Sequence, residues 1–283
     1  MAVKEMDAET EAAATTQGSL MSVDWGGLLR RLLVPTAIVL LWFAVTWDRM
    51  IDPIFLPSPA DIRDSVVSLW PLLPESFTAS LVMTLGGFLG GTGLGLAIGL
   101  VMAYSRMARE VFGGVLDFFR PVPIFALIPL FILWFGLGKT PQIAMIMLGT
   151  SLVIGVSTIE AIKNVPAVYI RAGLVLGATR WTIYKSIILP AIFPHLLGAI
   201  RVAAAASWGL DVAAEYIGAQ VGLGHLMIIR VQYLDTSGIM VIVAIYCLLA
   251  VALDKLVVAL ERPLTRWTEK TAGRGAVTSI TGA

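Results

Sequence analysis

Six long apolar stretches constrain this chain more than any other feature of its sequence. They lie near residues 33–50, 81–104, 113–135, 142–162, 191–213 and 238–260. A bilayer core needs about 20 apolar residues per helix, and a spanning segment must satisfy its own backbone hydrogen bonds. The 283 residues are 58% hydrophobic and 14% charged, outside the usual balance of a water-soluble domain. We therefore expect an all-α, multi-pass membrane protein with about six transmembrane helices.

The basic residues predict how these helices are oriented, because lysine and arginine accumulate on the cytoplasmic side of short loops. With the N-terminus inside, fourteen of the twenty fall on the cytoplasmic side, and only Arg49, Arg63, Lys139 and Arg230 fall outside. Both termini and the 163–190 loop are thus expected in the cytoplasm. The predicted organisation is a disordered cytoplasmic segment at 1–29, a transmembrane domain at 30–262 and a cytoplasmic tail at 263–283.

The two longer outside connections differ in character. Residues 51–80 contain five prolines around an amphipathic run at about 60–70, which predicts a short helix lying on the outer surface. Residues 214–237 contain Gly222-Leu223-Gly224 followed by an apolar stretch. This second segment is either a partly re-entrant gate helix or a loop packed on the helix ends.

Glycines and prolines distinguish two of the spans. Glycines recur at four-residue spacing from Gly86 and Gly87 to Gly99, which lets helix backbones approach closely in lipid, either within the chain or at a homodimer contact. The third span contains Arg120-Pro121-Val122-Pro123, where missing backbone donors predict a kink or a partly unwound start. Such a broken helix is either part of a transport pathway or a rigid structural kink.

Charged residues at membrane depth each need an explanation. Glu160 precedes Lys163 by about one helical turn, which favours a local ion pair. Asp211 and Glu215 share one helix face and could pair with Arg120 or Arg201 in a structural network. The alternative is that the arginines hold a passing anion while the two acids guard the outer gate. The candidate pathway residues are Arg120, Pro121, Pro123, Arg201, Trp208, Asp211 and Glu215.

Motifs for catalysis, nucleotides or metals are scarce. Gly138-Lys139-Thr140 resembles the end of a phosphate-binding loop, but Leu133 stands where that motif needs its first glycine. His195 and His225 fall on opposite sides of the predicted topology, so no multi-histidine metal site is expected. Asp211 and Glu215 leave open a stand-alone membrane enzyme, although no nucleophile accompanies them. A facilitator or channel working alone is a third alternative.

Residues 164–188 form a polar interruption between two apolar stretches. Asn164 and Pro166 predict a helix start, Gly177 predicts its end, and Thr179 can cap a second short helix. Two such helices on the inner face, with apolar side chains such as Leu176 and Trp181, suit insertion into a groove on another protein. The alternative is a structural cap over the bundle.

This loop resembles the EAA loop of binding-protein-dependent ABC importer permeases. The pattern of that loop is Glu-Ala-Ala-x-x-x-Gly, nine residues, then Ile-x-Leu-Pro. The matching positions are Ala172, Gly177, Ile187, Leu189 and Pro190. Arg171 replaces the glutamate and Gly173 replaces the second alanine, which removes any salt bridge from the acidic residue. FLPSP at 55–59, RPVPIFALIPLFILWFGLGKTP at 120–141 and GLGHL at 222–226 look most like the nitrate, sulfonate and taurine branch.

The resemblance implies the type I ABC importer permease fold in a bacterial inner membrane, with 164–188 as the coupling loop. It also implies a homodimer, two cytoplasmic ATP-binding subunits carrying ATP and Mg, and an extracytoplasmic solute-binding protein. No nucleic-acid partner and no cofactor on this chain are expected. The implied docking residues are Ala172, Gly173, Leu176, Gly177, Ala178, Arg180, Trp181, Tyr184, Leu189 and Pro190. The expected cargo is a small anion such as a sulfonate, taurine or nitrate, and a non-sulfonate organic or neutral solute is the alternative.

Overall fold

The computed structural model describes residues 25–264 and the side chains of residues 33–261, and the chain divides into two units, with the boundary between Pro59 and Ala60. The predicted segments 1–29 and 263–283 therefore lie almost wholly outside the described residues. In the first unit, α2 (Trp25–Thr46) is followed by turns, and the Trp42 indole donates a hydrogen bond to the Pro57 carbonyl at 3.1 Å. In the part of the chain that the structure describes, all regular structure is helical.

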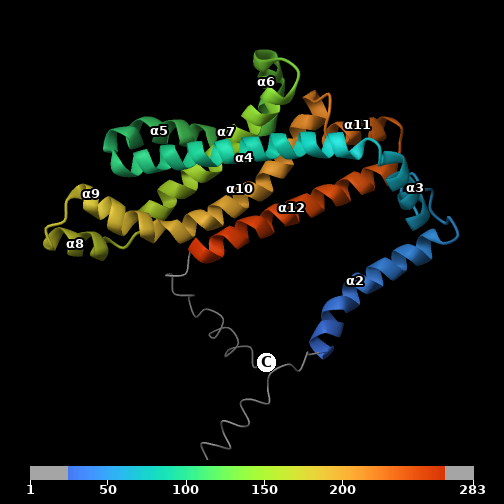
Figure 1. The fold of residues 1–283 in the computed structure, drawn as a ribbon, viewed down its shortest axis with the longest axis horizontal. Helices are drawn as coiled ribbons and strands as arrows, with labels where there is room; N and C mark the ends of the chain where they lie inside the picture. Colours follow the sequence, from blue (N-terminus) through green and yellow to red (C-terminus); the bar gives the residue numbers. More distant parts are fainter. Residues whose placement is uncertain (1–24, 265–283) are drawn as a thin grey trace, which may run out of the picture. The chain divides into compact units, whose positions relative to one another are not determined.

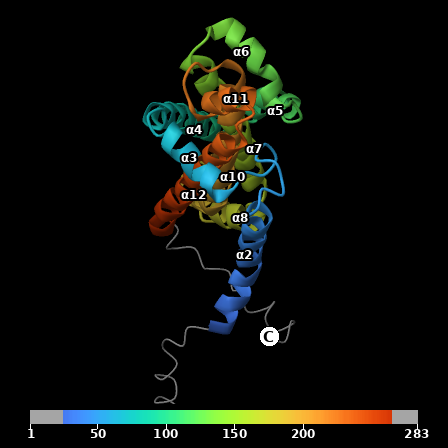
Figure 2. The same cartoon turned by 90° about the vertical axis from the view of Figure 1, so that its right-hand side faces the viewer.

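The second unit is a bundle of long helices joined by shorter ones. The long helices are α4 (Leu73–Tyr104), α7 (Lys139–Lys163), α10 (Leu189–Gly218) and α12 (Thr236–Leu264). The shorter helices are α3 (Pro59–Leu69), α5 (Arg106–Phe119), α6 (Ile128–Phe135), α8 (Ala167–Val175), α9 (Arg180–Ile183) and α11 (Leu223–Gln232). Figure 1 shows α8 and α9 at one end of the bundle and α3 and α11 at the other, and Figure 2 gives the perpendicular view.

The predicted count of six spans is only partly reached. Within the described residues, four helices are long and apolar enough to cross a bilayer, or five if α5 and α6 form one broken span. The predicted span 113–135 is interrupted by a 90° bend, and the described apolar part of α2, Leu33–Thr46, is too short to cross by itself. The helix expected at 60–70 is present as α3.

The bend lies where the prolines predict it. Pro121 and Pro123 follow the end of α5, and the chain resumes as a 3₁₀ turn, η1 (Ile124–Leu127), before α6. Proline removes a backbone donor and disfavours helix at the preceding residue, so a straight helix cannot continue through this segment. The predicted kink is confirmed as a complete break.

The glycine repeat packs α4 against α7 within one chain. A Cβ atom on Gly91 would lie 2.5 Å from the Met147 backbone oxygen, and one on Gly95 would lie 2.6 Å from the Ser151 backbone oxygen. Gly87 and Gly99 make equally close approaches to α7 side chains, and we call these four positions the glycine seam. Of the two alternatives for the repeat, the structure supports packing within the chain.

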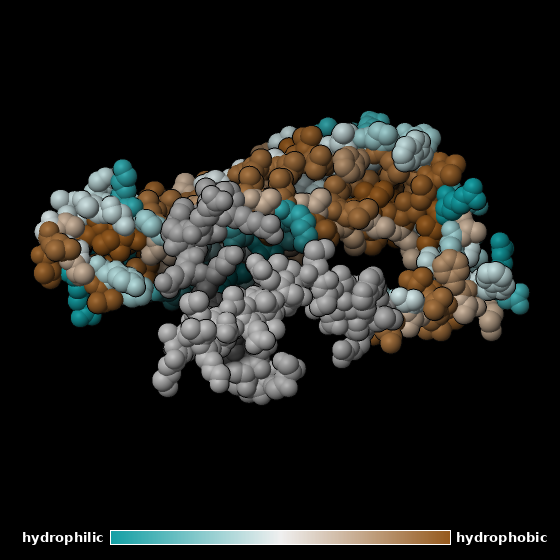
Figure 3. Space-filling model, turned by 60° about the horizontal axis from the view of Figure 1, so that its bottom comes forward, coloured by the Kyte–Doolittle hydropathy of each residue, from teal (hydrophilic) through white to brown (hydrophobic). Residues whose placement is uncertain are grey.

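α10 runs through the centre of the bundle. Its buried residues Ala203, Ala204 and Trp208 belong to one core cluster with Ile154 of α7 and Ile242 of α12. Large apolar side chains stay exposed on the outer faces of the long helices, and Figure 3 shows hydrophobic surface over much of the face that it presents. Apolar surface outside and a close-packed core inside are what a bundle surrounded by lipid requires.

Candidate functional site

The 164–188 segment folds into a helical hairpin at one end of the bundle. α8 begins after Pro166 and ends at a turn in which Gly177 has φ +77°. The Gly177 N–H donates to the Leu174 carbonyl at 3.0 Å, and the Ala178 N–H donates to the Gly173 carbonyl at 2.9 Å. This is the Schellman arrangement, which places glycine in the left-handed conformation directly after the helix. The predicted helix end at Gly177 is confirmed.

The second arm of the hairpin differs from the prediction. The Thr179 side chain caps α9 by accepting from the Thr182 N–H at 3.2 Å, as expected. However, α9 is not a separate surface helix, because it continues through a π-helical turn, η2 (Tyr184–Ile188), into α10. The Leu189 N–H reaches back five residues to the Tyr184 carbonyl, and Pro190 follows in the first turn of α10, where a missing donor is tolerated.

The hairpin exposes a group of apolar side chains at its tip. Val175 is 87% exposed and Leu176 is 86% exposed, and Leu174 and Trp181 are more than half exposed. Side chains of this kind are a minority on a water-facing surface unless a partner covers them. We call these four side chains, at the junction of α8 and α9, the hairpin tip.

The ten residues predicted to dock divide into surface and interior positions. Those that are exposed are Ala172, Leu176, Gly177, Arg180, Trp181 and Pro190, and those that are half-buried are Ala178 and Leu189. Gly173 is buried against Ile183 and Ile187, and Tyr184 is only 7% exposed. The Tyr184 hydroxyl donates to the Leu100 carbonyl of α4 at 2.9 Å, so this side chain anchors the hairpin to the bundle.

At the opposite end of α10, two acidic side chains are fully buried. Asp211 and Glu215 are each 0% exposed. The Ser80 hydroxyl of α4 donates to Glu215 at 2.6 Å, and the Tyr246 hydroxyl of α12 lies 3.2 Å from Glu215 and 3.4 Å from Asp211. We call Ser80, Asp211, Glu215 and Tyr246 the buried node. It ties three long helices together.

The buried node also holds the start of α11. The Gly224 N–H donates to Glu215 at 2.7 Å, and the Leu223 N–H donates to the Ser80 hydroxyl at 2.8 Å. A carboxyl group at a helix N-terminus satisfies donors that have no partner within the helix. A Cβ atom on Gly222 would overlap the Glu215 carboxyl group, so glycine is required at this close approach. The 214–237 segment is thus a helix packed on the helix ends, and its role as a gate stays a prediction.

The arginines at depth do not pair with the buried acids as the sequence suggested. Arg120 contacts Glu160 at 3.3 Å, and Arg201 contacts Asp254 at 3.0 Å. The network of either arginine with Asp211 or Glu215 is therefore wrong, as is the expected pair of Glu160 with Lys163. Spacing along one helix favoured only the pair of Glu160 with Lys163, and the arginine network was a hypothesis about which helices are neighbours; the fold instead brings the end of α5 next to α7 and α12 next to α10.

The remaining predicted pathway residues lie apart from one another. Pro121 and Pro123 form the break between α5 and α6, while Trp208 is 4% exposed and packs edge-on against Tyr246 beside the buried node. Arg120 and Arg201 stay substantially exposed on the bundle surface. One chain does not bring these residues together into a single site.

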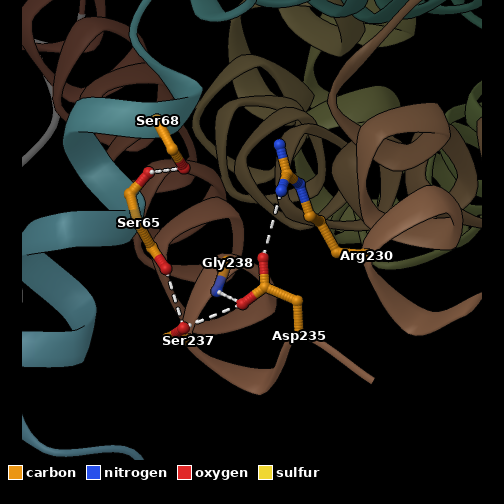
Figure 4. Close-up of polar contacts among 6 residues, drawn as sticks. All are labelled: Ser65, Ser68, Arg230, Asp235, Ser237 and Gly238. Atoms are coloured by element: carbon orange, nitrogen blue, oxygen red, sulfur yellow. Dashed lines mark hydrogen bonds and ion pairs between the residues drawn. The ribbon is translucent and has the colours of Figure 1, made fainter. Parts of the chain in front are cut away.

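A second polar cluster fixes the corner between α11 and α12 (Figure 4). Asp235 accepts from the Gly238 N–H at 2.8 Å and from the Ser237 hydroxyl at 2.8 Å, and it pairs with Arg230 at 3.2 Å. Ser65 of α3 donates to Ser237 at 2.7 Å. Burial acts to raise the pKa of the Asp235 carboxyl, but these hydrogen bonds and the Arg230 charge outweigh it, so the pKa lies below its usual range.

Sequence reasoning missed Ser80, Tyr246 and Ser65. Ser80 lies directly before an apolar run, Tyr246 lies within one and Ser65 lies in the amphipathic stretch at 60–70, and none of the three belongs to a motif or a repeat. An isolated hydroxyl in a membrane span suggests a hydrogen bond to another helix, but it does not say to which one.

The helical bundle, with its apolar exterior and four or five helices long enough to cross a bilayer within the described residues, is that of a multi-pass membrane protein. The chain belongs to the family of binding-protein-dependent transport system inner membrane components, which matches residues 91–266. It is a transport component rather than an enzyme, in agreement with its curated relatives.

Two relatives and one solved structure illustrate the similarity. The taurine transport system permease protein of Escherichia coli is 32% identical over 249 residues, covering 83% of this chain and 89% of that protein. The riboflavin transport system permease protein of Chloroflexus aurantiacus is 32% identical over 259 residues, covering 88% and 93%. The crystal structure of an amino acid ABC transporter aligns with a TM-score of 0.60 at 21% identity, covering 70% of this chain and 97% of that chain, and supports the fold.

Proposed function

We propose that this chain is the membrane-spanning permease subunit of an ATP-driven importer, and that the 164–188 hairpin is where a separate ATP-binding subunit docks. The observation that carries this proposal is the hairpin tip. Its apolar side chains are held away from the bundle by a rigid turn, although burial within the chain would be more favourable. A groove on a partner would remove them from water.

In this proposal the permease works with two ATP-binding subunits, which carry ATP and Mg, with an extracytoplasmic solute-binding protein and with a second copy of itself. Its orientation follows from the basic residues, with both termini and the hairpin in the cytoplasm. Closure of the ATP-binding subunits would move the two hairpins together and switch the bundle between inward-open and outward-open states. The continuous helical run from Arg180 to Gly218 supports this mechanism, because it joins the hairpin to the far end of the bundle.

For the cargo we propose a small anion of the sulfonate or taurine kind. The taurine relative supports this class, and Arg120 and Arg201 each keep donors beyond the single bond to their carboxylate partner. A larger organic solute is the second candidate, because the riboflavin relative has the same identity to this chain. A stand-alone enzyme is disfavoured, since Asp211 and Glu215 are fully buried and Glu215 already binds several donors.

The docking role can be tested with a substitution that leaves the fold unstrained. Leu176→Asp places a charge on an 86% exposed side chain and is expected to abolish co-purification with the ATP-binding subunit. Tyr233→Asp is the matched control, because Tyr233 is 78% exposed and lies on the α11 side of the bundle. Retention of the ATP-binding subunit and of solute-stimulated ATP hydrolysis by Leu176→Asp would contradict the proposal.

The turn provides a second test with a different physical basis. Gly177→Val forces a β-branched residue into the left-handed conformation, which costs about 1–2 kcal/mol. The hairpin tip is expected to lose its shape while the bundle stays folded, so uptake in proteoliposomes stops and the ATP-binding subunit keeps its unstimulated rate. Uptake at the level of the unsubstituted protein would mean that the shape of the hairpin is not needed to couple the ATP-binding subunit to transport.

A further inference from the structure

A cavity lies between α5 and α7, close to the end of α4. It has a volume of about 230 Å³ and is lined by Arg109, Gly113, Asp117 and Arg120 of α5 and by Glu160 and Lys163 of α7, with other residues. A second hollow of about 140 Å³ shares Met102, Arg109, Ile159 and Lys163 with it. We call the two together the α5 cavity. It is outside the hairpin and the buried node, and of its basic residues Arg109 and Lys163 have no role in the proposed docking or in the proposed cargo binding, whereas Arg120 is also a cargo candidate.

α5 exposes its apolar face and turns several of its charged residues toward the interior, which is the reverse of a helix in a water-soluble protein. Met107, Val111, Val115 and Phe118 recur every three or four residues and are all at least 49% exposed. Arg109, Asp117 and Arg120 lie away from this apolar face and line the cavity, whereas Arg106 and Glu110 pair with each other outside it. In a membrane protein this arrangement places apolar side chains toward lipid and charges toward an enclosed polar space. The α5 cavity therefore lies directly beside the lipid.

Hydrogen bonds hold the two arginines of the cavity in place, and none of its three cations uses all of its hydrogen-bond donors. The Arg109 guanidinium donates to the Met102 and Ala103 carbonyls at 3.1 Å each, which fixes it at the end of α4 and leaves three of its five donors. Arg120 spends one donor on Glu160. The Lys163 ammonium makes no hydrogen bond or ion pair with the residues that the structure describes.

The net charge of the cavity lining predicts the charge of the ligand. Arg109, Arg120 and Lys163 face Asp117 and Glu160, which gives the lining a net charge of +1. One singly charged group balances this lining, whereas a doubly charged phosphate would leave an excess negative charge beside two carboxylates. A phosphodiester carries one negative charge and acceptor oxygens that suit arginine and lysine.

Two glycines make room for such a group. A Cβ atom on Gly114 would meet no atom within 4 Å, and one on Gly113 would meet only the Met102 side chain at 3.7 Å. Both glycines line the cavity on the α5 side. Glycine costs about 1 kcal/mol relative to alanine within a helix. The two glycines therefore leave open space at a cost to the stability of α5.

From these observations we infer that the α5 cavity binds a singly charged phosphodiester group, supplied by the headgroup of an anionic phospholipid. The shared chemistry is a phosphate group, which free inorganic phosphate could also offer. The lipid is favoured by the net charge of +1 and by the exposed apolar face of α5 beside the cavity. Basic pockets between transmembrane helices are known to hold anionic headgroups. Such a lipid would join α4, α5 and α7 next to the hairpin.

The test measures lipid binding, so its outcome does not depend on transport or on the proposed docking. The full chain, purified by itself in detergent, is titrated with phosphatidylglycerol or phosphatidylcholine, and bound lipid is counted by native mass spectrometry. A third series adds inorganic phosphate. Phosphatidylglycerol is expected to bind more tightly than phosphatidylcholine, and millimolar phosphate is expected not to displace it.

Two variants separate charge from space. Lys163→Gln removes the unpaired cation and is expected to weaken phosphatidylglycerol binding about fivefold, the effect of one basic residue near a membrane surface. Gly114→Leu fills the cavity without changing a charge and is expected to remove the preference for phosphatidylglycerol. Lys255→Gln is the matched control, because Lys255 is an exposed lysine of α12 outside the cavity.

Four results would overturn the inference. The first is equal binding of the two lipids, and the second is an unchanged preference in both Lys163→Gln and Gly114→Leu. The third is an equal loss in Lys255→Gln, which would indicate general surface charge. The fourth is displacement of phosphatidylglycerol by inorganic phosphate, which would assign the cavity to the free ion.

Discussion

The glycine seam allows a prediction with an internal control. Gly91→Ala adds a Cβ atom 2.5 Å from the Met147 backbone oxygen and 2.7 Å from the Thr150 Cβ, whereas ordinary contact begins at 3.4 Å. The closest of these distances falls short by 0.9 Å, and the obstacle is backbone, which cannot rotate away. α4 and α7 would have to separate along their contact. Gly93→Ala is the control, because a Cβ atom there meets nothing within 4 Å.

The two variants share the same gain in helix propensity, so their difference isolates the packing. Alanine improves on glycine by about 1 kcal/mol within a helix. Overpacking of a close contact costs about 1–3 kcal/mol, and the upper end applies where backbone is the obstacle. Gly93→Ala is therefore expected to be stabilised by about 1 kcal/mol and Gly91→Ala to be destabilised by about 2 kcal/mol.

The measurement is a titration of the purified chain from mild micelles into a denaturing detergent, followed by circular dichroism. The unfolding midpoint of Gly91→Ala should fall below that of the unsubstituted chain, and that of Gly93→Ala should rise slightly above it. Equal midpoints for the two variants would refute the close approach of α4 and α7. A lower midpoint for Gly93→Ala than for Gly91→Ala would mean that α4 contacts α7 through the face that carries Gly93 and not through the glycine seam.

Three further predictions concern polar contacts. Ser80→Ala removes one of the donors to Glu215 and leaves the Leu223 N–H without its buried acceptor, so it should lower the free energy of unfolding by about 2–3 kcal/mol in the same titration; no change would show that the buried node is not formed. Glu160→Gln removes an exposed ion pair and should cost less than about 1 kcal/mol, so a larger loss would indicate a buried pair. Because the folded-state pKa of Asp235 is depressed, its contribution to stability is complete above the usual Asp pKa of about 3.9 and is lost as pH falls below that value. Asp235→Asn should therefore flatten the pH dependence of unfolding in this range, and an unchanged slope would contradict the assignment.

Local rules explain which parts of the structure could be predicted from the sequence. The break at Pro121 and Pro123, the turn at Gly177 and the cap at Thr179 all depend on backbone chemistry within a few residues. The glycine seam depends only on spacing along one helix. These predictions required no knowledge of which helices are neighbours.

Partner choice across helices could not be predicted in the same way. The sequence places Glu160 one turn from Lys163, yet Arg120 is its partner, because the fold brings the end of α5 next to α7. Glu215 similarly binds Ser80, which lies 135 residues away along the chain. Charged side chains at membrane depth bind the polar groups that tertiary packing brings close to them. Spacing within one helix does not reveal which groups those are.

The two ends of α10 show how a signal at the hairpin could reach the far end of the bundle. The helical run Arg180–Gly218 has 39 residues, which corresponds to roughly 58 Å of helix. Tyr184 ties its first part to α4 through the Leu100 carbonyl, and Glu215 ties its last part to α4, α11 and α12. A displacement of the hairpin therefore acts on one continuous helix with polar attachments at both ends. Because the polar bonds of Glu215 to α4, α11 and α12 lie at the far attachment, we propose that these three elements are the ones that respond to a displacement of the hairpin.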